Sequence, residues 1–166
     1  MDGNCHFMFG TVTGISLSLI LGLDFEESVL LTSTAMLGSI APDIDAETSA
    51  VGNLTKPIST MIYKVNASLG HAKERHRSLF HDLAFWIGLL VLSLYKFPVL
   101  KGFFIGGLSH LFLDMFNPSG VPLFFVFNIR LARLKSNSKE AIVLTAILTV
   151  LFLTFGMLYH FKVIRF

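Results

Sequence analysis

The feature that most constrains this chain is a run without Asp, Glu, Lys or Arg at residues 141–161. A helix of about 20 apolar residues is long enough to cross the hydrocarbon core of a bilayer. Hydrophobic residues make up 53% of the chain and its mean hydropathy is +0.68, which is too apolar for an ordinary water-exposed surface. The sequence therefore predicts an integral membrane protein with a spanning helix at this run.

Charge and cysteine content exclude other classes of protein. The formal net charge is only +2 and its carriers are scattered, whereas nucleic-acid binding needs a clustered basic surface. The single cysteine, Cys5, excludes an internal disulfide framework and a cysteine-rich zinc knuckle. The first six residues lack the basic segment of a signal peptide, so we expect the apolar run after them to remain as a helix.

Further apolar segments predict four more helices. They lie at residues 7–23, 28–40, 78–95 and 99–116. Pro42 is expected to end the second, because a proline disfavours helical geometry in the residue before it, and Ser78 is the expected N-cap of the third. The fold class predicted is therefore all-α: a polytopic membrane protein with a bundle of about five transmembrane or membrane-embedded helices, in a single domain spanning residues 1–166.

Two segments do not fit a spanning helix. Residues 43–77 form a polar loop, within which the apolar patch at 58–65 could lie as a short interfacial helix. Residues 117–139 begin with turn-forming residues, continue uncharged and end as a basic linker. We interpret this second segment as re-entrant or interfacial.

The distribution of basic residues predicts the orientation. With a cytoplasmic N-terminus, nine of the 13 Lys and Arg residues fall on the cytoplasmic side and the other four outside. The four are Lys96, Lys101, Lys162 and Arg165. The positive-inside rule therefore favours a multi-pass protein of the cell (inner) membrane with this orientation.

This topology places most of the histidine and aspartate residues at one membrane face. They are His6, Asp43, Asp45, His76, His81, His110 and Asp114. Ionisable groups at the edge of the hydrocarbon are costly unless they are paired or bound, so they indicate function. Imidazoles and carboxylates without thiolates suit one or two divalent ions, with zinc or manganese favoured and iron a further candidate. We therefore predict a metal site facing the cytoplasm.

The spacing within the chain supports this site to different degrees. His110 and Asp114 are four residues apart and share one helix face, although a polar contact or a proton relay would also explain them. Asp43 and Asp45 surround a helix end, which they could instead cap. His76 and His81 are five apart, so His76 is expected on the loop and His81 in the first helical turn.

Charged residues beside the ligands suggest an anionic substrate. Lys73, Arg75 and Arg77 precede His81, and a guanidinium can hold two phosphate oxygens while a metal polarises a third. The positive-inside rule alone would also explain these three residues. Asp82 is either a partner of the ligands or a solvated side chain.

Four motifs in order resemble a known family. They are His6, the stretch GSIAPDID at 38–45, HRSLFH at 76–81, and GLSHLFLD at 107–114 followed by NPSGVPL at 117–123. Together they resemble the YdjM-like family of membrane-bound, LexA-regulated, metal-dependent hydrolases. The resemblance covers residues 6 to about 127 and implies a metal site and hydrolysis.

The chain departs from the family pattern at three positions. The third motif resembles His-Arg-Gly-x-Thr-His, so Ser78 and Phe80 differ while both histidines and Arg77 match. The fourth resembles Asp-x-x-Thr-Pro-x-Gly, so Asn117 stands where threonine is common. We include Asn117 among the candidate substrate-binding residues.

The function predicted is metal-assisted hydrolysis at the membrane surface, with Asp45 or Asp82 accepting a proton from water and Arg77 binding phosphate. A phospholipid or polyprenyl phosphate ester is the expected substrate, although an amide or peptide would also fit. A metal-ion or proton transporter is the main alternative. A non-catalytic membrane subunit with a structural metal is another.

Overall fold

The computed structural model describes residues 2–164 except 46–48, 69–78, 97–99 and 125. Its elements are α1 (Gly3–Leu21), α2 (Phe25–Gly38), the 3₁₀ turn η1 (Ala41–Asp45), α3 (Ala50–Leu54), α4 (Lys56–Ser68), the 3₁₀ turn η2 (Leu79–His81), α5 (Leu83–Lys96), α6 (Lys101–Asp114), β1 (Val121–Leu123), β2 (Phe127–Ile129) and α7 (Lys139–His160). The chain is therefore mostly helical, as predicted.

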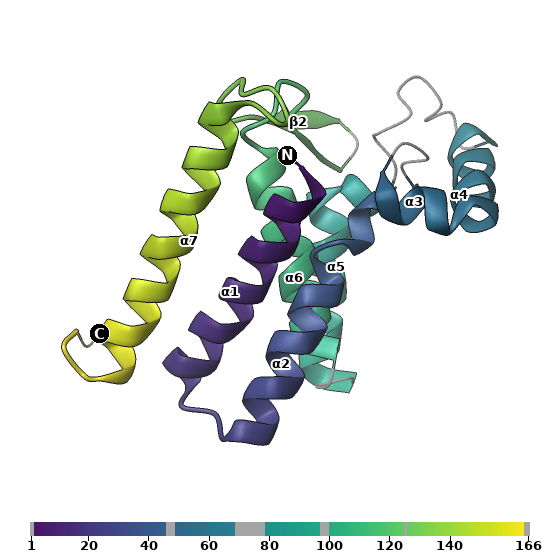
Figure 1. Cartoon of the computed structure of the whole chain (residues 1–166). Coiled ribbons are helices and arrows are strands. Elements are labelled where there is room, and N and C mark those ends of the chain that lie inside the picture. The colour runs from purple at the N-terminus through teal and green to yellow at the C-terminus, as the bar shows by residue number, and fades with distance from the viewer. Residues whose placement is uncertain (1, 46–48, 69–78, 97–99, 125, 165–166) are drawn as a thin grey trace.

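Helix α1 lies at the centre of a layer of long helices (Figure 1). It packs against α2, α6 and α7, while α6 also packs against α2 and α5. Within the described residues, α1 and α7 are long and apolar enough to cross a membrane. Helices α2, α5 and α6 have 14 residues each, or about 21 Å, which is shorter than the hydrocarbon core of about 30 Å. Five full spans are therefore not confirmed.

The hairpin of α1 and α2 follows from its connecting residues. Gly22 ends α1 in the left-handed conformation with φ 62°, which glycine adopts without steric cost. The Asp24 carboxylate then accepts a hydrogen bond of 2.9 Å from the Glu27 backbone N–H and caps α2. The second helix thus begins at Phe25, three residues before the start predicted from the apolar run.

Small residues allow α2 and α6 to approach closely. A Cβ atom added to Gly106 of α6 would overlap the Ala35 carbonyl oxygen of α2, and one added to Gly38 would overlap the Phe103 carbonyl oxygen. Such close contact is common between membrane helices, where association depends on packing because lipid tails are as apolar as the helices. The backbone of α2 therefore lies directly against α6.

Two sequence predictions about secondary structure are corrected. Residues 121–129 include an antiparallel hairpin of β1 and β2, so the fold is not strictly all-α. The third helix begins at Leu83 after a short 3₁₀ turn, and its cap is Asp82, whose carboxylate accepts hydrogen bonds from Ala84 and Phe85. The predicted cap, Ser78, lies outside the described residues. His81 consequently belongs to η2 and not to the first turn of the α-helix.

A buried apolar cluster lies between α5, α6, η1 and β1. Trp86, Phe104 and Leu111 are its largest members, with Ala41 and Val121 beside them. The Trp86 indole N–H donates a hydrogen bond of 2.6 Å to the Phe80 carbonyl oxygen. This bond ties η2, and with it His81, to the core.

Candidate metal centre

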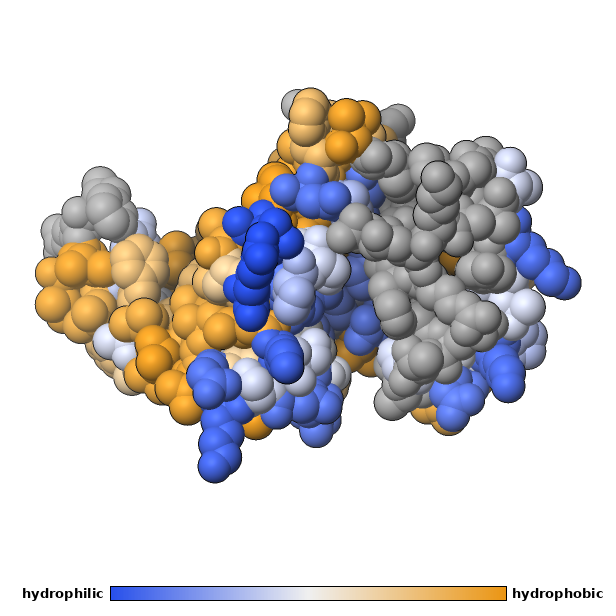
Figure 2. All heavy atoms as spheres, turned by 90° about the horizontal axis from the view of Figure 1, so that it is seen from above, coloured by the Kyte–Doolittle hydropathy of each residue, from blue (hydrophilic) through white to orange (hydrophobic). Residues whose placement is uncertain are grey.

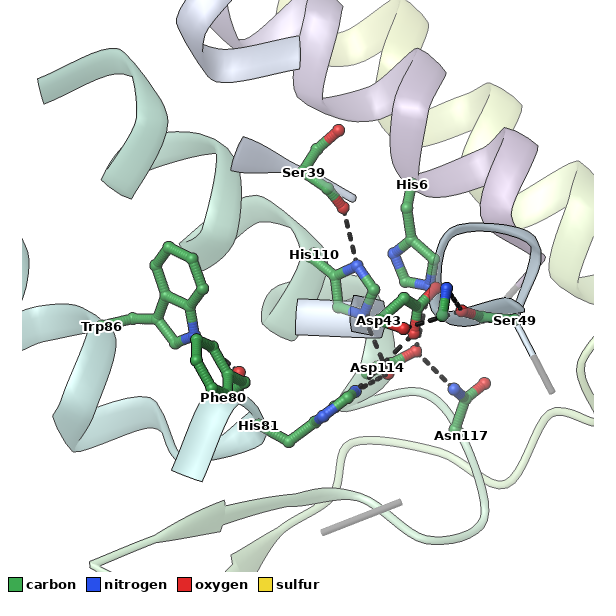
Figure 3. Close-up of polar contacts among 11 residues, drawn as sticks. His6, Ser39, Asp43, Ser49, Phe80, His81, Trp86, His110, Asp114 and Asn117 are labelled. Carbon is green, nitrogen blue, oxygen red and sulfur yellow. Dashed lines mark hydrogen bonds and ion pairs between the residues drawn. The ribbon is translucent and has the colours of Figure 1, made fainter. Parts of the chain in front are cut away.

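Four separate elements bring five side chains to one point. His6 lies in the first turns of α1, Asp43 in η1, His81 at the end of η2, and His110 and Asp114 in the last turns of α6. Figure 3 shows the three imidazoles and two carboxylates pointing toward one another. The site is thus built from residues 108 positions apart in the sequence (114 − 6), at the end of the molecule that also carries the N-terminus (Figure 1).

The donor atoms are close but not optimally hydrogen-bonded. His6 Nε2 lies 3.2 Å from Asp114 Oδ1, and His110 Nε2 lies 3.4 Å from Asp114 Oδ2. Asp43 Oδ1 lies 3.7 Å from His110 Nε2 and 3.8 Å from His81 Nε2, and the latter nitrogen lies 4.0 Å from Asp114 Oδ2. Most of these separations exceed a good N–H···O hydrogen bond. Direct pairing therefore does not explain the cluster fully.

The tautomer of His110 leaves one nitrogen for a ligand. Its Nδ1 lies 2.7 Å from the Ser39 carbonyl oxygen, which can only accept a hydrogen bond, so Nδ1 carries the proton. The Nε2 atom of a neutral imidazole is then a lone-pair donor aimed into the cluster. Such a bond from the remote ring nitrogen to a carbonyl is typical of metal-binding histidines.

The donor set fits a divalent cation. Two ligand atoms at about 2.0–2.1 Å from one ion lie about 2.9–4.0 Å apart at bond angles of about 90–140°, which spans the observed separations. His110 Nε2 and His6 Nδ1 are buried and make no hydrogen bond to a described residue. An unsatisfied buried nitrogen is costly, and a cation at His110 Nε2 would remove that cost. Imidazole and carboxylate together are ligands that zinc and manganese accept.

The described ligands form two overlapping groups. One contains His6, His110 and Asp114, and the other contains Asp43, His81 and His110. Both groups use His110, whose Nδ1 is already committed to Ser39, so a single Nε2 atom serves both. One ion at this shared nitrogen would lie within reach of both groups. A second ion, which the sequence also allowed, would need donors beyond these five.

Burial defines an open side of the cluster. His110 is completely buried and His6 is 1% exposed, whereas the Asp43 side chain is 23% exposed. The histidines therefore form the floor and the carboxylates the rim. Seen from this end, hydrophilic residues lie beside an apolar flank of the molecule (Figure 2). A polar molecule would reach the cluster from the carboxylate side.

Asn117 lies against the candidate ligands. Its amide Nδ2 donates a short hydrogen bond to Asp114 Oδ1, and the side chain is buried. This bond orients the carboxylate that both His6 and His110 contact. The sequence predicted substrate binding for Asn117, whereas its contact in the structure is with Asp114.

Several predicted residues cannot be placed. Asp45 ends η1, but its side chain is outside the described residues, as are all of His76, Lys73, Arg75 and Arg77. Asp82 is 1% exposed and caps α5, so the alternative of a solvated side chain is wrong. Its capping bonds give it a structural explanation that requires no part in catalysis.

Two groups near the candidate centre were not identified from the sequence. The Ser39 carbonyl oxygen orients His110, but a backbone atom carries no residue-type signal. Arg130 donates a hydrogen bond of 2.7 Å to the Pro118 carbonyl oxygen, directly after Asn117. In the sequence, the basic residues of this segment served only to predict the membrane orientation. No motif or spacing therefore pointed to Arg130.

Comparison with known proteins places the chain among membrane proteins. It is 27% identical over 167 aligned residues to the uncharacterized protein YvsG of Bacillus subtilis, covering 96% of this chain and 98% of the relative. It is 33% identical over 101 residues to the inner membrane protein YdjM of Escherichia coli, covering 56% of this chain and 47% of the relative.

The matching YdjM of Shigella flexneri has the same identity and coverage. No solved structure is significantly similar. The family profile described as YdjM inner membrane protein matches residues 1–164, nearly the whole sequence. Two helices that could span a membrane, a cluster able to hold a metal ion and this match agree, and the chain belongs to the YdjM family of inner membrane proteins.

Proposed function

We propose that this chain is a membrane-embedded, metal-dependent hydrolase that cleaves a phosphate ester of a lipid at the membrane surface. The observation that carries the proposal is the convergence of three imidazoles and two carboxylates on the buried Nε2 of His110. A purely structural polar cluster would be expected to satisfy its own buried atoms, whereas His110 Nε2 and His6 Nδ1 have no hydrogen-bond partner in the part of the chain that the structure describes. A divalent cation bound at His110 Nε2 would complete it.

The bound ion would supply an acidified water and polarise the scissile phosphoryl group. His110 and His6 would fix its position, because their rings are stacked with centroids 3.6 Å apart and both are buried. Asp43 is the more exposed carboxylate and faces the open side, so it is the described residue best placed to accept a proton from water. Asp45 remains a candidate for the same role.

The position of the centre favours a lipid substrate. His6 lies near the start of a helix able to span a membrane, and α7 begins at the same end of the molecule (Figure 1). A centre at this level meets lipid headgroups, whose phosphate is the polar group nearest to it. Arg130, held beside Asn117 through Pro118, adds a guanidinium to the phosphate-binding candidates Lys73, Arg75 and Arg77.

Transport is less well supported by the sequence. Residues 7–23 and 141–158 contain no ionisable side chain that would carry ions across the hydrocarbon. His160, at the far end of α7, has its Nδ1 atom 3.2 Å from the Leu19 carbonyl oxygen. The ionisable residues of the two long helices therefore lie at their ends, which suits a surface reaction better than a pathway.

Metal content tests the proposal directly. Detergent-purified wild-type protein is expected to carry one transition-metal ion per chain by elemental analysis, and His110→Ala to lose it. His160→Ala is the matched control, because it removes a histidine at the opposite end, and it should retain the metal. Wild-type protein without stoichiometric metal would eliminate the proposed centre.

Activity is tested separately. Phosphatidic acid and a polyprenyl phosphate in vesicles should release inorganic phosphate in the presence of wild-type protein, and a chelator should abolish the release. Asp43→Asn should lower the rate much more than it lowers the metal content. A metal-loaded protein that cleaves neither ester would contradict the proposed phosphate-ester hydrolase.

A further inference from the structure

An apolar groove runs between the two long helices on the half of the molecule away from the metal centre. It encloses about 680 Å³ and is lined by Leu17 and Ile20 of α1 and by Leu151, Phe155 and Leu158 of α7, among others. The α7 residues 151, 155 and 158 share one helix face through their spacing of three and four. Helices α1 and α7 touch beside the groove, where Gly156 lies against Ser16.

A smaller apolar pocket of about 220 Å³ lies beside the groove, toward the end of the molecule that carries the centre. Phe9 of α1, Ser109 and Phe112 of α6, and Phe152 of α7 contribute to its lining. Phe152 lines both spaces. Phe9 follows His6 by one helical turn and Ser109 directly precedes His110, so the apolar lining continues from the groove toward the candidate ligands.

The position and the lining of the groove indicate what it binds. Leu17 is 11 residues beyond His6, or about 16 Å along the helix, which places the groove inside the hydrocarbon core when the centre lies at the surface. No water is available there, and the lining is almost entirely apolar. The volume lies within the usual range of about 300–1,000 Å³ for ligand pockets. A hydrocarbon chain fits this environment.

We propose that the groove binds one hydrocarbon chain of the lipid whose phosphate group reaches the metal centre. The inference rests on the proposed function and names the substrate class as a phosphate ester carrying a long chain. A hydrocarbon chain gains little free energy by moving from bulk lipid into the groove. The groove therefore orients the chain, while the metal centre supplies the affinity for the headgroup. Orientation of this kind aligns the scissile bond.

Photocrosslinking tests the occupant with a matched pair of sites. A photoreactive phenylalanine analogue is placed at Leu151, which lines the groove, or at Val150, which does not; the two positions are 59% and 63% exposed. In phosphatidylethanolamine vesicles containing some phosphatidic acid, the share of adducts formed with phosphatidic acid should be severalfold higher at position 151 than at position 150, which faces bulk lipid. Equal shares would overturn the proposal, and a covalent dimer of the chain at 151 would mean that a second copy covers the groove.

Filling the groove tests its part in the reaction. Leu17→Trp should lower the hydrolysis of long-chain phosphatidic acid severalfold, with less effect on a short-chain analogue and none on metal content. Ile147→Trp, on exposed α7 surface outside the groove, should change neither rate. Thr154→Trp fills the same groove from α7 if Leu17→Trp does not fold.

These readouts separate the two proposals. Unchanged long-chain hydrolysis in a stable, groove-filled variant would overturn the chain-binding site while leaving the hydrolase intact. Wild-type protein without metal or activity would instead eliminate the hydrolase. The adduct comparison at positions 150 and 151 would then still decide whether the groove holds lipid.

Discussion

At the scale of residues, His110 is the point on which the candidate centre depends. Its Nδ1–H is held by the Ser39 carbonyl oxygen, and its Nε2 lies within 3.4 Å of Asp114 and 3.7 Å of Asp43. The His81 ring lies edge-on to it, with centroids 5.6 Å apart. Because the imidazole is fixed from both sides, its lone pair has a defined direction before any ligand arrives.

Asn117 should tune the affinity of the centre through Asp114. Asn117→Ala removes the donor that orients the carboxylate, so metal affinity should fall about 10–100-fold, as for other partners of metal ligands. Asn117→Thr, the residue common in the resembled family, keeps a hydroxyl donor and should retain most of the affinity. Competition with a metal indicator measures the metal affinity. Asn128→Ala, at an exposed position of β2, is the control. Equal affinity in Asn117→Ala would contradict the role.

Metal binding should weaken as the solution becomes acidic. Imidazoles bind metal only in the deprotonated form and carboxylates in the ionised form, so binding releases protons and lowering the pH reverses it. Dialysis against buffers from neutral to acidic, followed by elemental analysis, should show progressive loss of metal. Circular dichroism should stay helical over the same range. Retention of all metal after acidification would argue against histidine ligation.

The sequence predicted much of this residue-scale picture. The five described candidate ligands lie together, as predicted from the apolar runs that place their helix ends at one membrane face. Their individual spacing was informative only for His110 and Asp114. The contribution of Ser39 could not be predicted, since any residue has a carbonyl oxygen and only the close approach of α2 to α6 aims this one.

At the scale of elements, the start of α5 shows that two candidate capping residues can lie close together in the sequence. Ser78 and Asp82 are both good capping residues, and the apolar run after each is compatible with a helix. The structure uses Asp82, because its carboxylate meets two backbone N–H groups while Trp86 ties the preceding turn to the core. Helix ends are therefore less predictable than helix existence.

Asp82 can be tested as a cap against a role as general base. Asp82→Ala should lower stability by about 1 kcal/mol through loss of the cap. Asp82→Asn keeps an oxygen acceptor for Ala84 but cannot accept a proton at neutral pH. We expect Asp82→Asn to keep both stability and hydrolysis, measured by thermal unfolding and phosphate release. A stable Asp82→Asn protein without activity would restore the catalytic interpretation.

The contact between α2 and α6 should be sensitive to a single methyl group. Gly106→Ala would push a Cβ into the α2 backbone at Ala35, so it should lower the melting temperature in detergent. It should also weaken metal binding, because Ser39 would move relative to His110. Gly88→Ala is the control: its Cβ would meet nothing within 4 Å, and alanine favours a helix by about 1 kcal/mol over glycine.

The β-hairpin was not predicted from the sequence, for a physical reason. Its strands have three residues each, and Pro122 within β1 is typical of an edge and not of a regular strand. Over so short a segment an apolar run does not distinguish strand from helix or interfacial coil. Only the structure shows the pairing of β1 with β2, in which Val121 also packs into the core.

At the scale of the whole molecule, the two ends differ in character. The candidate centre, the hairpin and the start of α7 gather at one end, while the C-terminus lies at the other (Figure 1). The orientation predicted from basic residues places the centre in the cytoplasm. A reporter active only in the periplasm should therefore work at the C-terminus and fail at the N-terminus. The reverse pattern would place the centre outside.

The spread of the ligands along the chain also has a consequence for biogenesis. His6 leaves the ribosome first and Asp114 more than a hundred residues later, so the coordination sphere is incomplete until α6 is made. An ion captured earlier would have too few partners to be retained. Loading of the proposed ion would therefore follow synthesis of α6, and a nascent chain truncated before it should leave the insertion machinery without metal.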